Sequence, residues 1–445
     1  MLKKSLNNFC LISLGCPKNL VDSENVVKNL IEQGFNLVQE NTSESIALVN
    51  TCAFIKPAVQ ETKDVIGSLI ERKNKSELSH IVVMGCFPSR FSVETLEKEF
   101  PQIDLFCPIK KKHEIPKLLK ALIRKKKNKK PVFPSANQSI NSLTPFYYSY
   151  IKISEGCQNY CSYCTIPGIR GSYKSRPIAE VCREIEQKVA YGLKEVILVA
   201  EDTTDWGTDI YGKPSLAELL KSITSIKGLE WVRIMYAYPS KISNELIKVI
   251  ANEEKICKYL DMPVQHINSS ILKTMNRSYS KQELINICQE LRKNIPNIAL
   301  RTSLIIGFPG ETEKEFKELR EFIREYPFDK LGCFAYSPEK ETRAYSLSNR
   351  VNRSVVSKRI DILMKDQLQR VIRKNKKSVG QNIRILYEGQ GRARTYQEAP
   401  DIDNIIQVPD HEGLIPGNLY LAKIIGYQEY DLVAIILGNE EQPKK

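Results

Sequence analysis

The stretch Ser154-Glu155-Gly156-Cys157-Gln158-Asn159-Tyr160-Cys161-Ser162-Tyr163-Cys164 (SEGCQNYCSYC) places three thiols within eight residues. It comes directly after an apolar segment, residues 148–154, that is typical of a buried β-strand. Zinc sites and most iron–sulfur sites take four protein ligands. The triplet therefore raises the question of which group supplies the fourth ligand.

The strand before the triplet opens a region in which strand-like and helical segments alternate. Helical patterns at residues 180–191, 215–225 and 280–293 lie between the strand-like segments. The predicted strands are residues 148–154, 195–200, 231–236, 259–262, 300–306 and 330–336. Strands joined by helical crossovers predict a full or partial (βα)6 barrel of parallel strands, in which chemistry lies at the carboxyl ends of the strands.

A second set of cysteines lies upstream. The apolar runs 8–14, 45–50 and 80–84 are each followed within two residues by a cysteine, and these cysteines are Cys16, Cys52 and Cys86. Their spacings of 36 and 34 residues each match about one βα repeat. Parallel strands end at one edge of a sheet, so we expect a doubly wound αβ domain with a second three-cysteine site. Three unrelated core cysteines are the alternative, and Cys10 and Cys107 are predicted to be of that kind.

The carboxyl-terminal region changes character after a charged helical pattern at residues 355–376. Four strand-like segments follow, at residues 382–387, 405–408, 419–426 and 432–437. They predict a small antiparallel β-barrel, a fold that often binds nucleic acid or protein. The α/β chain is thus divided into an amino-terminal domain (7–123), a basic linker (124–141), a central barrel (143–373) and a carboxyl-terminal barrel (376–442).

The composition indicates an ordinary soluble protein with an acidic partner. Of 445 residues, 42% are hydrophobic and 27% charged, and no apolar run approaches the ~18 residues of a membrane span. The net charge of +14 favours a partner such as RNA. The apolar start resembles a signal peptide only weakly, since Pro17, Lys18 and Asn19 interrupt it. We expect a cytoplasmic location, where clustered cysteines bind metal more often than they form disulfides.

A fourth protein ligand for the triplet is hard to find. Cys182 and His266 are candidates, but neither makes a standard zinc spacing. A zinc-dependent RNA-binding protein remains the distant alternative. The favoured interpretation is a [4Fe-4S] cluster with one open iron, which S-adenosylmethionine (SAM) chelates before it is cleaved to a 5′-deoxyadenosyl radical.

The Cys-x3-Cys-x2-Cys pattern resembles that of the radical SAM superfamily, and the segment SLIIGFPGET at 303–312 resembles its glycine-rich turn. The resemblance implies that Cys157, Cys161 and Cys164 hold the radical cluster. It also implies that four further residues contact the cofactor, namely Tyr163, Gln265, Gly307 and Gly310.

Nearly the whole chain resembles the methylthiotransferase family, in the branch that modifies a ribosomal protein. The resemblance rests on SLGCPKNLVDSE at 13–24, EDTT at 201–204 and EAPDID at 398–403, with departures at Glu201 and Asn404. It implies that Cys16, Cys52 and Cys86 hold a second [4Fe-4S] cluster, which delivers sulfur, and that two SAM molecules are used per turnover. It also implies that the carboxyl-terminal barrel is a TRAM-like substrate-binding domain. The three acidic residues of EAPDID are predicted to face a basic ribosomal protein.

The function implied is methylthiolation of an aspartate of the small-subunit ribosomal protein at the decoding centre (ribosomal protein twelve), free or in the assembled subunit. The resemblance provides no catalytic residue beyond the cluster ligands. We expect a monomer without a membrane partner, reduced by a flavodoxin-like or ferredoxin-like protein, and the charge allows a contact with RNA. A methylthiotransferase acting on an adenosine of transfer RNA is the alternative, which the +14 charge supports.

Overall fold

The computed structural model describes residues 6–126, 142–410 and 412–439. It divides into two compact units, and each is described by itself. The first contains residues of Met1–Thr144, Glu155–Tyr173 and Glu339–Thr342, and the second contains residues of Pro145–Ser154, Lys174–Pro338 and Arg343–Lys445. Both barrels belong to the second unit, whereas the loop that carries the triplet of Cys157 belongs to the first. Within the described residues, none of the helices combines the length and the apolar character needed to span a bilayer.

The first unit is built on a parallel sheet with the strand order β2-β1-β3-β4-β5. The three strands predicted to precede cysteines are all present, as β1, β3 and β4. The bounds are β1 Asn8–Ser13, α1 Pro17–Glu32, β2 Asn36–Leu37, β3 Ile46–Thr51, α2 Lys56–Asn74, β4 His80–Gly85, α3 Phe87–Arg90, α4 Val93–Glu99, β5 Leu105–Pro108, η1 Ile109–Glu114 and α5 Ile115–Lys126.

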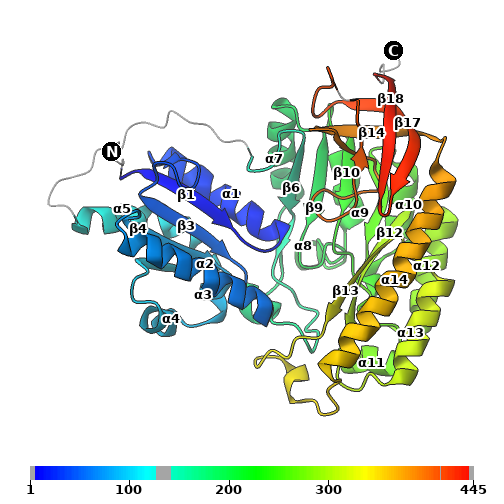
Figure 1. Ribbon diagram of the computed structural model, residues 1–445, viewed down its shortest axis with the longest axis horizontal. Coiled ribbons are helices and arrows are strands. Elements are labelled where there is room, and N and C mark those ends of the chain that lie inside the picture. The colour runs from blue at the N-terminus through cyan, green and yellow to red at the C-terminus, as the bar shows by residue number, and fades with distance from the viewer. Residues whose placement is uncertain (1–5, 127–141, 411, 440–445) are drawn as a thin grey trace. The chain divides into compact units, whose positions relative to one another are not determined.

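Both faces of this sheet are covered by helices, as Figure 1 shows. Successive side chains of a strand point to opposite faces. Val49 accordingly packs with residues of α2 and α4, while Leu48 packs with residues of α1 and α5. Burial on both sides explains why the strands are continuous apolar runs instead of alternating ones. The predicted doubly wound domain is confirmed, and α5 continues to Lys126. The rest of the predicted linker, residues 127–141, lies outside the described residues.

The second unit contains an open sheet of six parallel strands in the order β13-β12-β11-β10-β9-β6. All six predicted strands are found, and the partial barrel is confirmed. The strands are β6 Tyr148–Lys152, β9 Glu195–Val199, β10 Trp231–Ile234, β11 Ile256–Asp261, β12 Ala299–Ile306 and β13 Lys330–Ala335, and β7 Ser154–Glu155 pairs with β8 Lys174–Ser175 outside this sheet.

Helices follow most of these strands. The predicted helical patterns correspond to α7, α9, α12 and the long helix α14, which runs beside β13 (Figure 1). The bounds are α7 Ile178–Ala190, α8 Thr208–Tyr211, α9 Leu216–Thr224, η2 Pro239–Lys241, α10 Asn244–Asn252, α11 Ser269–Thr274, α12 Lys281–Asn294, α13 Glu313–Glu325, η3 Arg343–Ser346 and α14 Arg353–Ser378. The short helix α6 Ile166–Arg170 belongs to the first unit.

The same unit ends in a closed five-stranded barrel, ordered β14-β15-β16-β18-β17. Its strands are β14 Asn382–Gly389, β15 Arg392–Arg394, β16 Ile406–Gln407, β17 Leu419–Gln428 and β18 Asp431–Asn439. The pairs are antiparallel except that of β16 with β18. The sequence did not predict β15, because its three residues, Arg-Ala-Arg, have no apolar alternation.

Candidate functional site

The structure places the three upstream cysteines at one edge of the first sheet. Cys16 is the N-cap of α1, Cys52 follows β3 directly, and Cys86 follows β4 as the N-cap of α3. Because β1, β3 and β4 are neighbouring parallel strands, their carboxyl ends meet. A Cβ atom on Gly15 would lie only 2.7 Å from the Cβ of Cys52, so the loop before Cys16 packs against the second cysteine. The three cysteines thus follow neighbouring strands at one edge, and that they hold a cluster stays a prediction.

Asn19 connects the positions of all three cysteines. Its side-chain amide Nδ2 donates to the carbonyl oxygens of Leu14 and Thr51, each at 3.0 Å, just before Cys16 and Cys52. Its Oδ1 accepts a hydrogen bond from Cys86 Sγ at 3.6 Å. Asn19 is fully buried. The sequence showed it only as part of a motif, with nothing to indicate these contacts.

The loop of the second triplet is held by its own backbone. The amide of Cys157 donates to the carbonyl of Gly171 at 3.3 Å. Gly156 has φ +74°, and a Cβ there would lie 2.2 Å from the carbonyl oxygen of Ser172, so only glycine fits. The three cysteines of this loop are half-buried, as is Tyr163. A contact of Tyr163 with the cofactor stays a prediction.

This loop is also bonded to the upstream cysteine edge. The hydroxyl of Thr165, directly after Cys164, donates to the carbonyl of Phe54 at 2.9 Å. Ile169, on α6, is buried in the apolar core on the α2 face of the sheet. The segments that carry the two triplets therefore fold as one piece.

Arg170 lies where these segments meet, and its side chain is almost completely buried. One terminal nitrogen, Nη1, donates to Glu155 at 2.6 Å and to Asp22 at 3.1 Å. The other, Nη2, donates to Asn19 Oδ1 at 2.6 Å and lies 3.7 Å from Cys86 Sγ. These contacts could not be predicted from the sequence, where Arg170 is a single cation in a predicted loop.

The donor set suits iron–sulfur clusters better than a single metal ion. None of the twelve cysteines, all in the described part of the chain, is in a disulfide. Among the described residues, no group of three His, Cys, Asp or Glu side chains is arranged around one metal position. A cube binds one thiolate per iron, so its ligands need not converge on one atom. Three thiols per triplet match the ligands of a [4Fe-4S] cluster with one open iron, and that the triplets hold such clusters stays a prediction.

The remaining predicted cofactor contacts lie at the carboxyl ends of β11 and β12. Gln265, at φ +65°, bridges to Leu304 of β12, and its amide donates to the carbonyl of Ser303 at 2.9 Å. Gly307, at φ +78°, follows β12, and a Cβ there would lie 2.3 Å from Val356 of α14. Close packing of α14 is thus one reason for that glycine. Whether Gln265, Gly307 and Gly310 touch SAM stays a prediction.

A buried acid holds this glycine-rich turn. Glu311 accepts the amide of Gly307 at 2.9 Å and an ion pair from Arg359 at 2.7 Å. Burial raises the pKa of Glu311 above its ordinary value despite these partners. His266 lies 3.7 Å from Glu311, and burial lowers its pKa to about 4, so the imidazole is neutral near pH 7. His266 is thus a buried neutral histidine, and no contact assigns it a catalytic role.

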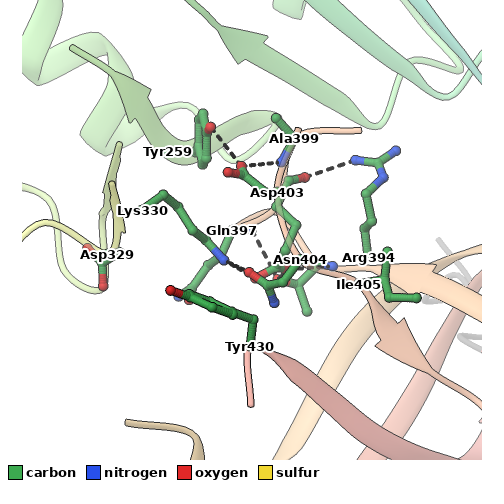
Figure 2. A network of polar contacts seen from close by, with 12 residues as sticks. Tyr259, Asp329, Lys330, Arg394, Gln397, Ala399, Asp403, Asn404, Ile405 and Tyr430 are labelled. Atoms are coloured by element: carbon green, nitrogen blue, oxygen red, sulfur yellow. Dashed lines mark hydrogen bonds and ion pairs between the residues drawn. The ribbon is translucent and has the colours of Figure 1, made fainter. Parts of the chain in front are cut away.

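The predicted acidic face on the carboxyl-terminal barrel is wrong. Glu398 is buried and pairs with Lys330 at 3.2 Å. Asp403 accepts from Tyr259 at 2.8 Å, as Figure 2 shows, and lies 3.6 Å from Arg301. Asp401 is exposed, but its Oδ2 accepts from two tyrosine hydroxyls of β6. These carboxylates face the central barrel because their partners there are half-buried cations and buried phenols, which the linear sequence does not show.

The segment 394–404 therefore binds the amino-terminal side of the open barrel. Its partners Glu195 and Lys330 are the first residues of β9 and β13, and Tyr259 is in register with Ala299, the first residue of β12. Arg394 donates to Glu195 at 2.8 Å, and Glu195 also accepts from Arg233 at 2.7 Å. The cofactor residues predicted above lie at the opposite, carboxyl ends.

Comparisons with known proteins agree with this architecture. Residues 151–323 match the Radical SAM superfamily, residues 8–108 match the family described as Uncharacterized protein family UPF0004, and residues 379–437 match the TRAM domain. In structure, the radical S-adenosylmethionine methyltransferase TsrM from Kitasatospora setae superposes with a TM-score of 0.53 at 15% identity, covering 74% of this chain and 72% of that chain. That likeness shows the fold alone.

Two relatives span nearly the whole chain, and both are named ribosomal protein uS12 methylthiotransferase RimO. The protein of Acetivibrio thermocellus is 40% identical over 449 residues, covering 97% of this chain and 99% of the relative. The protein of Clostridioides difficile is 40% identical over 438 residues, covering 96% and 98%. The chain belongs to the radical SAM methylthiotransferase family, in the branch of the ribosomal protein uS12 methylthiotransferases.

Proposed function

We infer that this protein attaches a methylthio group to an aspartate side chain of ribosomal protein uS12. The observation that carries the inference is the 40% identity to uS12 methylthiotransferases over 97% of the chain. Two cysteine triplets in the structure support it. One lies at an edge of the first sheet, and the loop of the other is hydrogen-bonded to the segment that follows that edge. Radical generation alone requires one cluster, so the second triplet favours sulfur insertion.

We assign the radical cluster to Cys157, Cys161 and Cys164, and a second, sulfur-delivering cluster to the three cysteines at the edge of the first sheet. When bound, the clusters and SAM supply one-electron chemistry and sulfur, which reach a carbon whose proton no side chain is basic enough to remove. Asn19 and Arg170 fix the segments around the upstream thiols. Glu311 fixes the turn after β12 by accepting the amide of Gly307.

The partners follow from this assignment. We infer that the enzyme meets uS12, free or in the small subunit, in the cytoplasm, and that a flavodoxin-like or ferredoxin-like protein reduces it. The TRAM domain and the charge of +14 support a contact with ribosomal RNA near the target. We further infer that the protein acts as a monomer with two SAM molecules per turnover.

The test is mass spectrometry of uS12 from a deletion strain complemented with variants of this chain. Cys157→Ala should abolish both deoxyadenosine release and the methylthio product. Cys52→Ala should leave deoxyadenosine release but remove the product. Cys288→Ala, a buried cysteine of α12 far in sequence from both triplets, is the matched control and should retain the product.

Transfer RNA from the same strains is digested and analysed in parallel. A methylthioadenosine that depends on this chain, with uS12 unmodified in all strains, would show that the transfer-RNA activity is the correct one. Methylthio product with Cys52→Ala would show that the upstream triplet does not deliver sulfur. A colourless protein with stoichiometric zinc after anaerobic purification would support the zinc-dependent alternative.

A further inference from the structure

Arg170 contacts both the loop of the radical triplet and a cysteine of the upstream triplet. It follows Cys164 by six residues and bonds to Glu155, two residues before Cys157. Its other terminal nitrogen lies within hydrogen-bonding distance of Cys86 Sγ, at 3.7 Å.

The guanidinium is fixed in place by its surroundings. Four contacts use its two terminal nitrogens, and one of the acceptors, Asn19 Oδ1, also receives Cys86 Sγ. Asp22 is fully buried and is paired a second time, by Lys112. A planar fork with several donors can reach the carboxylates and the sulfur together, which a lysine ammonium on the same stem cannot do.

Arg170 brings one positive charge next to Cys86. It belongs to a network of ion pairs with Lys112, Asp22 and Glu155, whose formal charges sum to zero. Without Arg170 the sum becomes −1. The potential of an iron–sulfur cluster depends on nearby net charge and on hydrogen bonds to its sulfurs. Removal of Arg170 would therefore disfavour adding an electron to a cluster held by Cys86.

We propose that Arg170 is a positioning residue of the upstream cluster, which orients the Cys86 ligand and raises the reduction potential of that cluster. The proposal rests on the proposed second cluster. It joins the two sites physically, because the same side chain is held by Glu155 in the loop of the radical triplet. The contact with Cys86 Sγ is the reason to expect the larger response from the upstream cluster.

The test uses the full chain, reconstituted anaerobically with iron and sulfide. In a background with Cys157, Cys161 and Cys164 all changed to Ala, only the upstream cluster remains, and its midpoint potential is followed by electron paramagnetic resonance. Arg170→Gln should shift that potential to a more negative value, and Arg170→Lys should restore part of the shift. In the reciprocal background, with the upstream triplet changed to Ala, Arg170→Gln should produce a smaller shift.

The matched control is Arg72→Gln. Arg72 also pairs with a buried carboxylate, Glu44, but Glu44 lies before β3, at the other end of the strand from Cys52. Arg72→Gln should leave the midpoint potentials of both clusters unchanged. Glu155→Gln provides a test of opposite sign that holds even where Arg170→Gln folds poorly, because removing a negative charge should shift the upstream potential to a more positive value.

Equal potentials for Arg170→Gln and Arg72→Gln, with iron content retained, would overturn the proposal while leaving the proposed function intact. A shift of the wrong sign with Glu155→Gln would do the same. Absence of any upstream cluster in the otherwise unchanged chain would overturn both. These outcomes are read from spectra and iron content, so they do not depend on methylthiolation of uS12.

Discussion

Replacing Glu195 by Gln should loosen the attachment of the carboxyl-terminal barrel to the central barrel. Glu195, Arg233 and Arg394 are all at most 1% exposed, and the Glu195 carboxylate pairs with both guanidiniums, while Arg394 has a second partner in Glu388. The amide keeps the shape of the side chain but leaves Arg233 without this carboxylate and Arg394 with Glu388 alone, and its NH2 group faces a donor. Breaking a buried pair by removing one partner costs about 3–5 kcal/mol. At about 1.4 kcal/mol per tenfold change, this cost corresponds to a factor of roughly 10²–10³ or more in local opening.

Hydrogen exchange of peptides covering 394–404 measures this opening directly. The control is Glu245→Gln, since Glu245 pairs with Lys221 at 3.0 Å with both side chains about half exposed. That pair should be worth no more than about 1 kcal/mol. Exchange in 394–404 that accelerates equally little in both variants would refute the conclusion that the buried triad fastens this segment. Arg394→Met should remove most of the additional effect of Glu195→Gln, because the two residues belong to one network.

Three further perturbations test other parts of the structure. The stability of the folded chain should fall as the pH drops from 6.5 toward 4, because burial lowers the pKa of His266 to about 4 and the unfolded chain binds more protons in this range. The urea midpoint of His266→Gln should lack this dependence on pH, and an unchanged dependence would contradict the assignment. Gly307→Ala should lower the urea midpoint for two reasons: the new Cβ would lie 2.3 Å from Val356, and the left-handed backbone conformation costs a residue with a Cβ about 1–2 kcal/mol. Adding Val356→Ala should relieve only the steric contact and recover part of the loss, and full recovery would exclude backbone strain. Gly156→Ala should leave about half of the iron after reconstitution, since only the upstream cluster would then form. The new Cβ would lie 2.2 Å from the carbonyl oxygen of Ser172 and distort the loop of Cys157. Full iron loading would show that the loop adapts.

Much of the site could be predicted from the sequence, because it depends on local order along the chain. A strand followed by a cysteine, three times, needs only the rule that parallel strands end at one edge, and Cys16, Cys52 and Cys86 follow it. The strands of the central barrel were also predicted from local patterns, because β6, β9, β10 and β11 are buried along nearly their whole length. The short strand β15 escaped prediction, because a closed barrel fixes it through its neighbours and not through its own composition.

The sequence by itself thus determined which residues we propose to carry the chemistry, namely two thiol triplets and the turn after β12, since each lies in or directly after a single βα unit. Only the tertiary structure decided what faces them. It turned Glu398 and Asp403 inward onto Lys330 and Tyr259. It also placed Arg170 against Cys86, 84 residues away in the chain. The physical reason is that a charged side chain is buried only where a partner compensates its charge, and these partners come from distant strands and helices.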